Sequence, residues 1–128
     1  MTSLNKILYA EDEPDILEIA ILALEGIGQF EVATCTSGIQ VIDLALEFEP
    51  QLILLDVMMP DMDGPTTLEA LKNNDTLKNI PIIFLTAKIL PDEIERFKSL
   101  GAVSVINKPF DPITLADKIK DIWAHLNE

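Results

Sequence analysis

The chain has 128 residues, 48% of them hydrophobic, which suits a single domain built around one hydrophobic core. Its 22 acidic residues outweigh 9 basic ones, so the formal net charge is -13. Nucleic acids and anionic membrane surfaces attract Lys and Arg, and this balance therefore argues against both as partners. It favours proteins or cations instead.

The ends of the chain and its single cysteine indicate where the protein works. The first residues, MTSLNKILYAED, hold one Lys and a short apolar run that meets acidic residues at once, so they predict neither a signal peptide nor a membrane span. Cys35 cannot form an internal disulfide and is interpreted as a small buried side chain, which favours a reducing compartment. We therefore expect a cytoplasmic protein. Without a repeat, a Gly/Ser linker or the start of an output domain, residues 1–128 are expected to form one domain.

The first predicted elements are a strand and a helix. The mostly apolar residues 6–10 predict a buried strand that runs directly into Glu11 and Asp12. Pro14 suits the first turn of a helix that reaches about Glu25. The helix is expected to bury Ile16, Ala20, Ala23 and Ile27, and to carry a neighbouring apolar strip of Leu17, Ile21 and Leu24. This strip is either a docking surface or part of a wide buried face.

The next elements lead to the most apolar strand of the chain. Residues 30–35 alternate in polarity, as an edge strand does. Ser37 is the expected N-cap of a second helix, which ends before Pro50. The unbroken run LILL at 52–55 is typical of a strand buried on both faces of a parallel sheet, and it ends at Asp56. The second helix is expected to present Val41, Ile42, Ala45, Leu46 and Phe48 at helical spacing.

A third helix and a fourth strand follow. Pro65 is predicted to start the helix, and the polar residues 73–75 close it. Residues 81–85 form a buried strand that delivers Thr86 and Lys88 at its carboxyl end. The third helix is expected to face inward through Leu68 and Leu71.

The last part of the chain is predicted to hold a helix, a strand and a final helix. Pro91 opens the fourth helix and Gly101 stops it. Residues 102–106 form a fifth strand, which delivers Lys108. Asp111 is the expected N-cap of the last helix, with Pro112 as its first residue. Its inner face is expected to carry Ile113, Ala116, Ile119, Ile122 and Leu126.

Five strands that alternate with five helices predict an α/β fold, a parallel sheet with helices on both faces. In open sheets of this kind, ligands bind outside the carboxyl ends of the strands. The unusual polar residues of the chain are all expected at that edge: Glu11, Asp12, Asp56, Thr86 and Lys108.

The chemistry of these residues points to phosphoryl transfer. Three carboxylates at one point repel each other unless a cation joins them, and an all-oxygen set with open positions suits Mg²⁺. Lys108 and the Thr86 hydroxyl offer a positive charge and a hydrogen bond to an anion. Asp56 is then a candidate nucleophile that takes a phosphoryl group as an acyl phosphate. An Asp at the end of an arbitrary strand is more often a helix N-cap or a turn residue than a nucleophile.

Other sites can be tested against the same sequence. Residues 59–70 superficially resemble a calcium loop, but Met59 and Ala70 stand where acidic ligands are needed. No phosphate-binding GxxxxGK[ST] and no dinucleotide-binding GxGxxG is present. His125, the only histidine, is expected on the surface of the last helical turn. A histidine-based catalytic centre is therefore not expected.

Four motifs in order resemble the receiver domain of two-component response regulators, of the stand-alone chemotaxis type. They are Glu11-Asp12, the stretch DVMMPDMDG that begins at Asp56, Thr86-Ala87, and Lys108-Pro109-Phe110. The similarity covers the whole chain. It implies a flavodoxin-like, doubly wound (βα)5 fold with strand order 2-1-3-4-5.

The resemblance also implies a metal site. Asp12, Asp56 and the main-chain carbonyl of Met58 are implied to bind Mg²⁺, while Glu11 acts largely through a metal-bound water. By the same resemblance the Lys108-Pro109 peptide is expected to be cis.

The function that the resemblance implies is a phosphorylation-activated signalling switch. Asp56 accepts a phosphoryl group from a sensor histidine kinase or a histidine phosphotransfer protein. Lys108 pairs with the phosphoryl group, and Thr86 reorients to bond it. The output is expected to be binding of a downstream protein or self-association, with no DNA-binding domain and no action on outside substrates. The sequence does not name the kinase, the target, or whether the chain acts as messenger or phosphate sink.

Two departures from the family pattern qualify this expectation. Val105 stands where many relatives carry an aromatic residue that swings inward on activation. Met58 and Lys88 are not the pair found in the fastest-dephosphorylating relatives.

A phosphatase-like enzyme with Asp56 as nucleophile is a second hypothesis, but Met58 takes the place of the second acid that haloacid-dehalogenase-type phosphatases need. A degenerate receiver that only binds partners is disfavoured, because all five site positions are filled.

Overall fold

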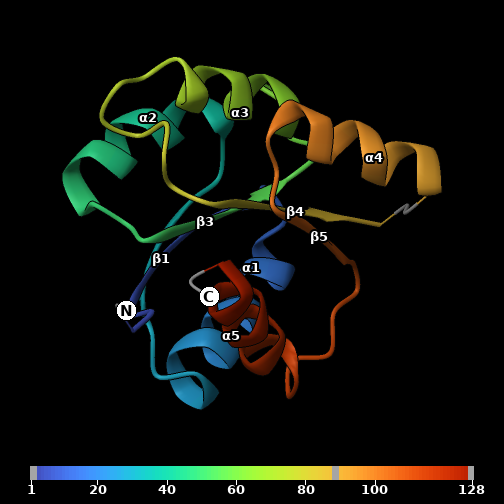
Figure 1. Ribbon diagram of the computed structural model, residues 1–128. Helices are drawn as coiled ribbons and strands as arrows, with labels where there is room; N and C mark the ends of the chain where they lie inside the picture. Colours follow the sequence, from blue (N-terminus) through green and yellow to red (C-terminus); the bar gives the residue numbers. More distant parts are fainter. Residues whose placement is uncertain (1–2, 88–89, 127–128) are drawn as a thin grey trace.

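A five-stranded parallel sheet forms the centre of the computed structural model, which describes residues 3–87 and 90–126 (Figure 1). The strands lie in the order 2-1-3-4-5. The predicted fold class and strand order are therefore confirmed. The strands are β1 (Lys6–Ala10), β2 (Glu31–Cys35), β3 (Leu52–Asp56), β4 (Ile82–Thr86) and β5 (Ser104–Asn107).

Helices cover both faces of this sheet. In Figure 1, α1 and α5 lie below the sheet, and α2, α3 and α4 lie above it. Each helix follows a strand along the chain, as the alternation in the sequence predicts. The helical segments are α1 (Pro14–Ile21), which continues into the π-helix η1 (Leu22–Ile27), then α2 (Gly38–Phe48), α3 (Gly64–Lys72), α4 (Pro91–Leu100) and α5 (Leu115–Leu126).

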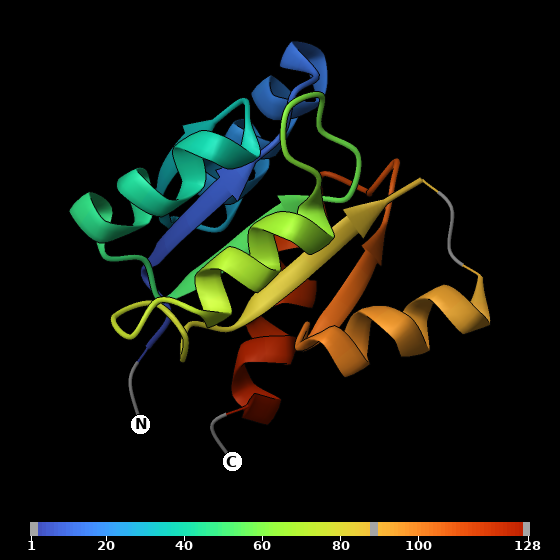
Figure 2. The ribbon, with the colours of Figure 1, turned by 90° about the horizontal axis from the view of Figure 1, so that it is seen from above.

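The sheet separates two hydrophobic layers. Every residue of β3 and β4 is buried, whereas β2 at the edge is mostly half-exposed. Side chains alternate along each strand, so Tyr9 and Leu54 pack on the α1 and α5 side, while Leu8, Ile53 and Phe84 pack on the other. All strands run the same way, and Figure 2 shows their carboxyl ends at one edge, with both chain ends at the opposite edge.

The first helix differs from the prediction in its second half. Its hydrogen bonding widens at η1, where the Gly28 amide donates to the carbonyl of Ala23, five residues back. The wider turn advances the buried face by one position, so Leu24 is fully buried and Ile27 is 54% exposed. The expectation that Ile27 faces the core is wrong, and the burial of Leu24 favours the wide buried face over the docking surface.

The last helix also begins later than predicted. Asp111 caps a turn instead of the helix, since its carboxylate accepts from the Ile113 amide at 2.9 Å and its carbonyl accepts from the Leu115 amide at 3.0 Å. Ile113 consequently projects outward and is 71% exposed, contrary to its predicted inward position. Leu126, also expected on the inner face, is 42% exposed, whereas Ala116 and Ile119 are buried as expected.

The N-terminal ends of α2 and α3 are satisfied in different ways. Asp63 caps α3 by accepting from the Thr66 amide at 2.8 Å. Ser37 stands at the predicted N-cap of α2, but its side chain makes no capping bond; it bonds to the carboxylate of Asp61, which also bonds to the Gly38 backbone. A residue of the β3–α3 loop therefore closes the end of α2.

Other expectations can be compared directly with the structure. Leu68 and Leu71 are buried, as predicted, and so is Cys35. The Lys108-Pro109 peptide is cis. No helix in the described parts of the chain combines the length and the apolar character needed to cross a membrane.

Candidate functional site

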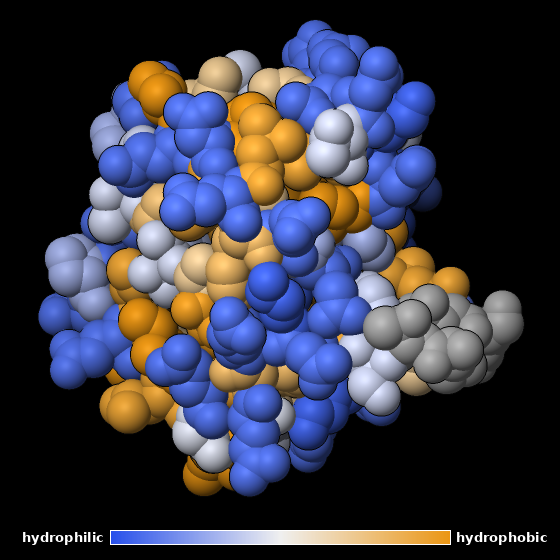
Figure 3. Space-filling view, turned by 90° about the vertical axis from the view of Figure 1, so that its left-hand side faces the viewer, coloured by the Kyte–Doolittle hydropathy of each residue, from blue (hydrophilic) through white to orange (hydrophobic). Residues whose placement is uncertain are grey.

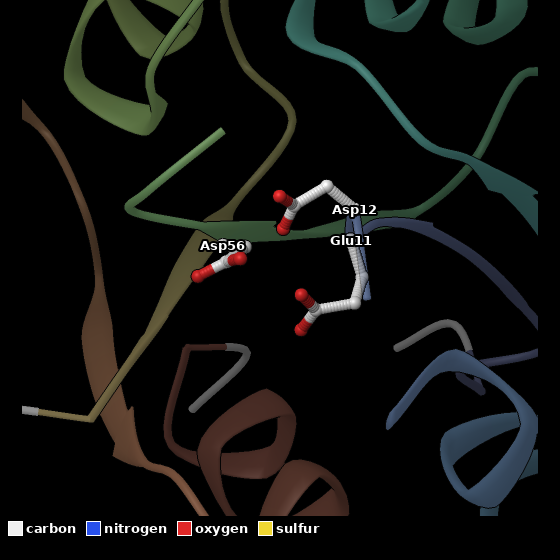
Figure 4. A group of neighbouring side chains, drawn as sticks. All are labelled: Glu11, Asp12 and Asp56. Carbon is white, nitrogen blue, oxygen red and sulfur yellow. The ribbon is translucent and has the colours of Figure 1, made fainter. Parts of the chain in front are cut away.

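Three carboxylates meet at the carboxyl edge of the sheet. Parallel pairing aligns Ala10 with Leu55, so the next residues, Glu11 and Asp56, lie side by side. Figure 4 shows Glu11, Asp12 and Asp56 facing a common space, and one oxygen of each lies within 4.8 Å of the others. Glu11 is fully buried, and Asp56 is only 3% exposed. The convergence expected for these three residues is present.

Lys108 supplies the positive charge of this cluster. Its Nζ lies 3.1 Å from Oε1 of Glu11 and 3.2 Å from Oδ1 of Asp56. The lysine follows β5 and reaches across the edge of the sheet, which brings it to a residue 97 positions earlier in the chain. An ion pair with two buried carboxylates offsets part of the cost of removing them from water.

The two buried carboxyl groups differ in acidity. Burial raises the pKa of Asp56 to about 7, and the hydrogen bond and negative charge of Glu11 add to this effect. Burial also acts to raise the pKa of Glu11, but hydrogen bonds from Asp56, Lys108 and Tyr9 outweigh it and lower that pKa. Asp56 is therefore the weaker acid of the two.

Hydrogen bonds from neighbouring groups hold both carboxylates. The Tyr9 hydroxyl donates to Oε1 of Glu11 at 2.9 Å. Longer contacts of 3.4 Å join the Glu13 amide to Glu11 and the Met58 amide to Asp56. The role of Tyr9 was not predicted, although its position two residues before Glu11 in a strand places both side chains on one face.

An open pocket of about 420 Å³ lies beside these groups. Thr86, at the end of β4, is 7% exposed and lines it together with Asp12, Asp56 and Lys108, while the buried Glu11 contacts Lys108 beside it. Met58 presents a side chain that is 76% exposed. Lys88 lies outside the described residues. The lining residues are Asp12, Glu13, Ile16, Asp56, Met58, Thr86, Ala87, Lys108 and Pro109.

The donor set fits a hard divalent cation. Mg²⁺ prefers oxygen ligands at about 2.0–2.1 Å in octahedral geometry, so two oxygens on one ion lie at most about 4.2 Å apart. Carboxylate oxygens within 4.8 Å of one another come close to this spacing. A water between one carboxylate and the ion would bridge the extra distance. Glu11, Asp12 and Asp56 could thus hold such an ion.

Comparison with known proteins identifies the family. Residues 7–120 match the response regulator receiver domain. The chain belongs to this family. Receiver domains of this family are the phosphorylation-dependent signalling domains of two-component systems, so the resemblance drawn from the motifs is confirmed.

The similar proteins differ in how much of their own length this chain matches. The DNA-binding dual master transcriptional regulator RpaA of Synechocystis sp. is 36% identical over 83% of this chain and 44% of that protein. The polar-differentiation response regulator DivK of Brucella anthropi is 30% identical over 91% of this chain and 94% of that protein. The chain spans about half the length of several curated relatives it matches, RpaA among them.

Solved structures show the same fold. The chemotaxis response regulator CheY4 of Vibrio cholerae superposes with a TM-score of 0.85 at 28% identity, covering 94% of this chain and 99% of that chain. A response regulator from Desulfuromonas acetoxidans has a TM-score of 0.85 at 27% identity, covering 95% and 98%.

Proposed function

We propose that this receiver domain is a signalling switch in which Asp56 is the phosphoacceptor. The observation that carries the proposal is the contact of a buried Asp56 with Lys108 at 3.2 Å, at the floor of an open pocket. An oxygen of Asp56 attacks the phosphorus of a phosphohistidine, the P–N bond breaks, and the imidazole leaves with the bonding electron pair and takes up a proton. The product is an acyl phosphate.

The other side chains of the pocket act on the transferred group. Lys108 is already aimed at the Asp56 oxygen and can pair with the phosphoryl oxygens as they arrive. Thr86 lines the same pocket, and its hydroxyl can donate to the phosphoryl group. These two groups bind and orient the anion. Their movement on binding also shifts the loops that follow β4 and β5.

The acidic cluster is proposed to hold Mg²⁺ through Asp12, Asp56 and the main-chain carbonyl of Met58, with Glu11 acting through a water. When bound there, Mg²⁺ would neutralise negative charge on the phosphoryl oxygens. The carboxylates of this chain provide the ligand oxygens and the negative charge of the site. Glu11, held by Lys108 and Tyr9, contributes negative charge from beneath the pocket.

The proposed partners are proteins, in a cytoplasmic setting. The donor is a sensor histidine kinase or a histidine phosphotransfer protein, and the phosphorylated form binds a downstream protein or a second copy of this chain. The formal net charge of -13 opposes nucleic acid and anionic membranes as direct ligands. Residues 1–128 are proposed to form one receiver domain.

A phosphatase-like enzyme remains the alternative from another class. It would use Asp56 in repeated turnover on outside phosphomonoesters. Membership of the receiver family and the absence of an acid at position 58 support the switch instead. Steady release of many phosphate ions per protein molecule from small phosphomonoesters would overturn the choice.

The phosphoacceptor is tested by labelling with a small phosphodonor and Mg²⁺. Intact-mass measurement should find one added phosphoryl group, stable to acid and labile to base, at Asp56. Asp56→Asn should abolish it, and removal of Mg²⁺ or Asp12→Ala should nearly do so. Asp43→Asn, an exposed carboxylate on α2 that does not line the pocket, is the matched control and should label normally. Undiminished labelling of Asp56→Asn would contradict the assignment.

A further inference from the structure

The hydroxyl of Tyr9 lies beneath the acidic site and takes no part in the chemistry described so far. It donates to Oε1 of Glu11 at 2.9 Å, and both residues are fully buried. Lys108 Nζ lies 3.1 Å from the same oxygen. The two short bonds of Glu11 therefore fall on Oε1, and they come from two different segments of the chain.

The second oxygen of Glu11 is held less tightly. Lys108 Nζ and the Glu13 amide each approach it only to 3.4 Å, and Asp56 bonds to the same carboxyl group. A carboxylate whose one oxygen is fixed by two donors has a defined orientation, and it keeps the other oxygen able to accept a further hydrogen bond. That orientation is what a carboxylate needs if it is to act on a metal through a water.

Packing alone does not account for the hydroxyl. The Tyr9 ring lies in the hydrophobic layer shared with Leu54 and α1, where a phenylalanine ring would fill the same space without a polar atom to desolvate. Burial, and then the charge of Glu11, raise the pKa of Tyr9, so its proton stays on the hydroxyl and remains available for donation.

We infer that Tyr9 is a positioning residue for the metal site: its buried hydroxyl orients Glu11, and this orientation sets the affinity of the acidic cluster for Mg²⁺. The inference rests on the proposed function, because it takes that cluster to be the metal site. Groups that orient metal ligands from behind typically change metal affinity about 10–100-fold when they are removed.

The direct test is Mg²⁺ binding by calorimetry to the unphosphorylated protein, at a temperature where circular dichroism shows every variant folded. Tyr9→Phe keeps the ring and should weaken Mg²⁺ binding about tenfold. Ile7→Val is the matched control, because Ile7 is fully buried in the same strand and the same hydrophobic layer but has no polar group. It should bind Mg²⁺ within about twofold of the natural chain, given that it leaves Glu11 untouched.

A double-mutant cycle separates positioning from general damage. If Tyr9 acts through Glu11, Tyr9→Phe should have no further effect on Mg²⁺ affinity in a Glu11→Gln background. An equal loss in both backgrounds, or unchanged affinity of Tyr9→Phe, would overturn the inference. A natural chain that binds no Mg²⁺ would instead contradict the proposed function, so the two failures are distinguishable.

A measurement on the unaltered protein covers the case in which Tyr9→Phe does not fold. Tyr9 is the only tyrosine, so a ¹³C label at the ring carbon bearing the hydroxyl gives a single assignable resonance. This resonance should shift during a Mg²⁺ titration and saturate with the calorimetric affinity. A resonance that stays unchanged through saturation would show that Tyr9 does not sense the metal site.

Discussion

At the scale of single residues, the site is built from charges that oppose one another. Glu11 and Asp56 are adjacent, buried carboxyl groups, and only Lys108 among the described residues is ion-paired with them. Like charges at this distance raise the free energy of the folded chain when no cation is bound. The arrangement that suits phosphoryl transfer therefore weakens the fold locally.

We predict that Asp56→Asn stabilises the metal-free protein. The amide keeps the shape of the side chain but removes one of two crowded negative charges, so the free energy of unfolding at pH 8 in EDTA should rise by about 1–3 kcal/mol. Urea denaturation measures this change. The control, Asp43→Asn on the exposed side of α2, should stay within about 0.5 kcal/mol. A destabilised Asp56→Asn would contradict the crowding argument.

At the scale of elements, the junction of α1, η1 and α5 depends on one glycine. A Cβ added at Gly28 would lie 2.7 Å from the Leu24 carbonyl oxygen and 2.9 Å from Cβ of Ala116 in α5. The backbone oxygen cannot move aside easily, so the close approach of η1 to α5 requires glycine here. A Cβ at the nearby Gly26 would meet nothing within 4 Å.

These two glycines give a matched prediction for stability. Gly28→Ala should lower the free energy of unfolding by about 1–3 kcal/mol, because the added methyl group forces η1 and α5 apart. Gly26→Ala should be neutral or stabilising by up to about 1 kcal/mol, since it only reduces the freedom of the unfolded chain. Thermal and urea denaturation of both variants tests the difference. Equal effects would show that the contact with α5 is not tight.

The apolar strip of the first helix was open to two interpretations, a docking surface or part of a wide buried face, and the structure favours the second. Leu17 and Ile21 are only half-exposed and Leu24 is buried, so the predicted strip belongs largely to the core. Instead, a small apolar pocket of about 100 Å³ opens next to Lys108 and Pro109. Its lining includes Ile19, which is 45% exposed. This pocket adjoins the phosphorylation pocket, a suitable place for contact with a phosphodonor protein.

We therefore expect Ile19→Glu to slow phosphotransfer from the partner kinase at least tenfold, because it places a charge in an apolar contact. Labelling by a small phosphodonor should be unchanged, since Ile19 does not line the phosphorylation pocket. Ile27→Glu, 54% exposed in η1, is the control and should leave both rates unchanged. Loss of both reactions in Ile19→Glu would indicate damage to the core instead of a docking defect.

At the scale of the whole molecule, the surface is acidic and carries hydrophobic residues in several places. Figure 3 shows one such face, where hydrophilic residues surround separate hydrophobic ones.

Phosphorylation would add about 1.5–2 further negative charges. The groups placed to respond are Thr86, which leads into the loop before α4, and Lys108, which begins the loop after β5. Val105, which pairs with Phe84 in β4, packs partly buried against the layer under α4 and has no aromatic ring to swing.

We predict that the phosphorylated state differs mainly in α4 and β5. In amide NMR spectra with and without a phosphoryl mimic, the largest shifts beyond the site should fall in residues 87–97 and 103–109, two of which, Lys88 and Ile89, lie outside the described residues. A switch of this kind needs a difference in partner affinity of only a few kcal/mol between states. Asp56→Asn should show no shifts with the mimic. Changes confined to residues 11–12 and 56–59 would contradict the prediction.

The sequence by itself determined the elements and the residues that meet at the site. Apolar runs such as 52–55, and boundaries such as Pro14, Pro65 and Gly101, are local signals that each segment carries in its own residues. Parallel strands bring their carboxyl ends to one edge, so Asp56 and Lys108 could be placed together before any distance was known. The strand order came only with the family resemblance, since periodicity does not encode it.

Only the tertiary structure decided the orientation of side chains that depend on distant contacts. The widening of α1 into η1 moved Leu24 inward and Ile27 outward, and helical periodicity could not foresee it because it assumes a uniform turn. Asp61 closes the end of α2 from another loop, and Tyr9 bonds to a carboxylate that Lys108 reaches from β5. Such contacts join residues brought close by the whole fold, and their energies are absent from any short stretch of sequence.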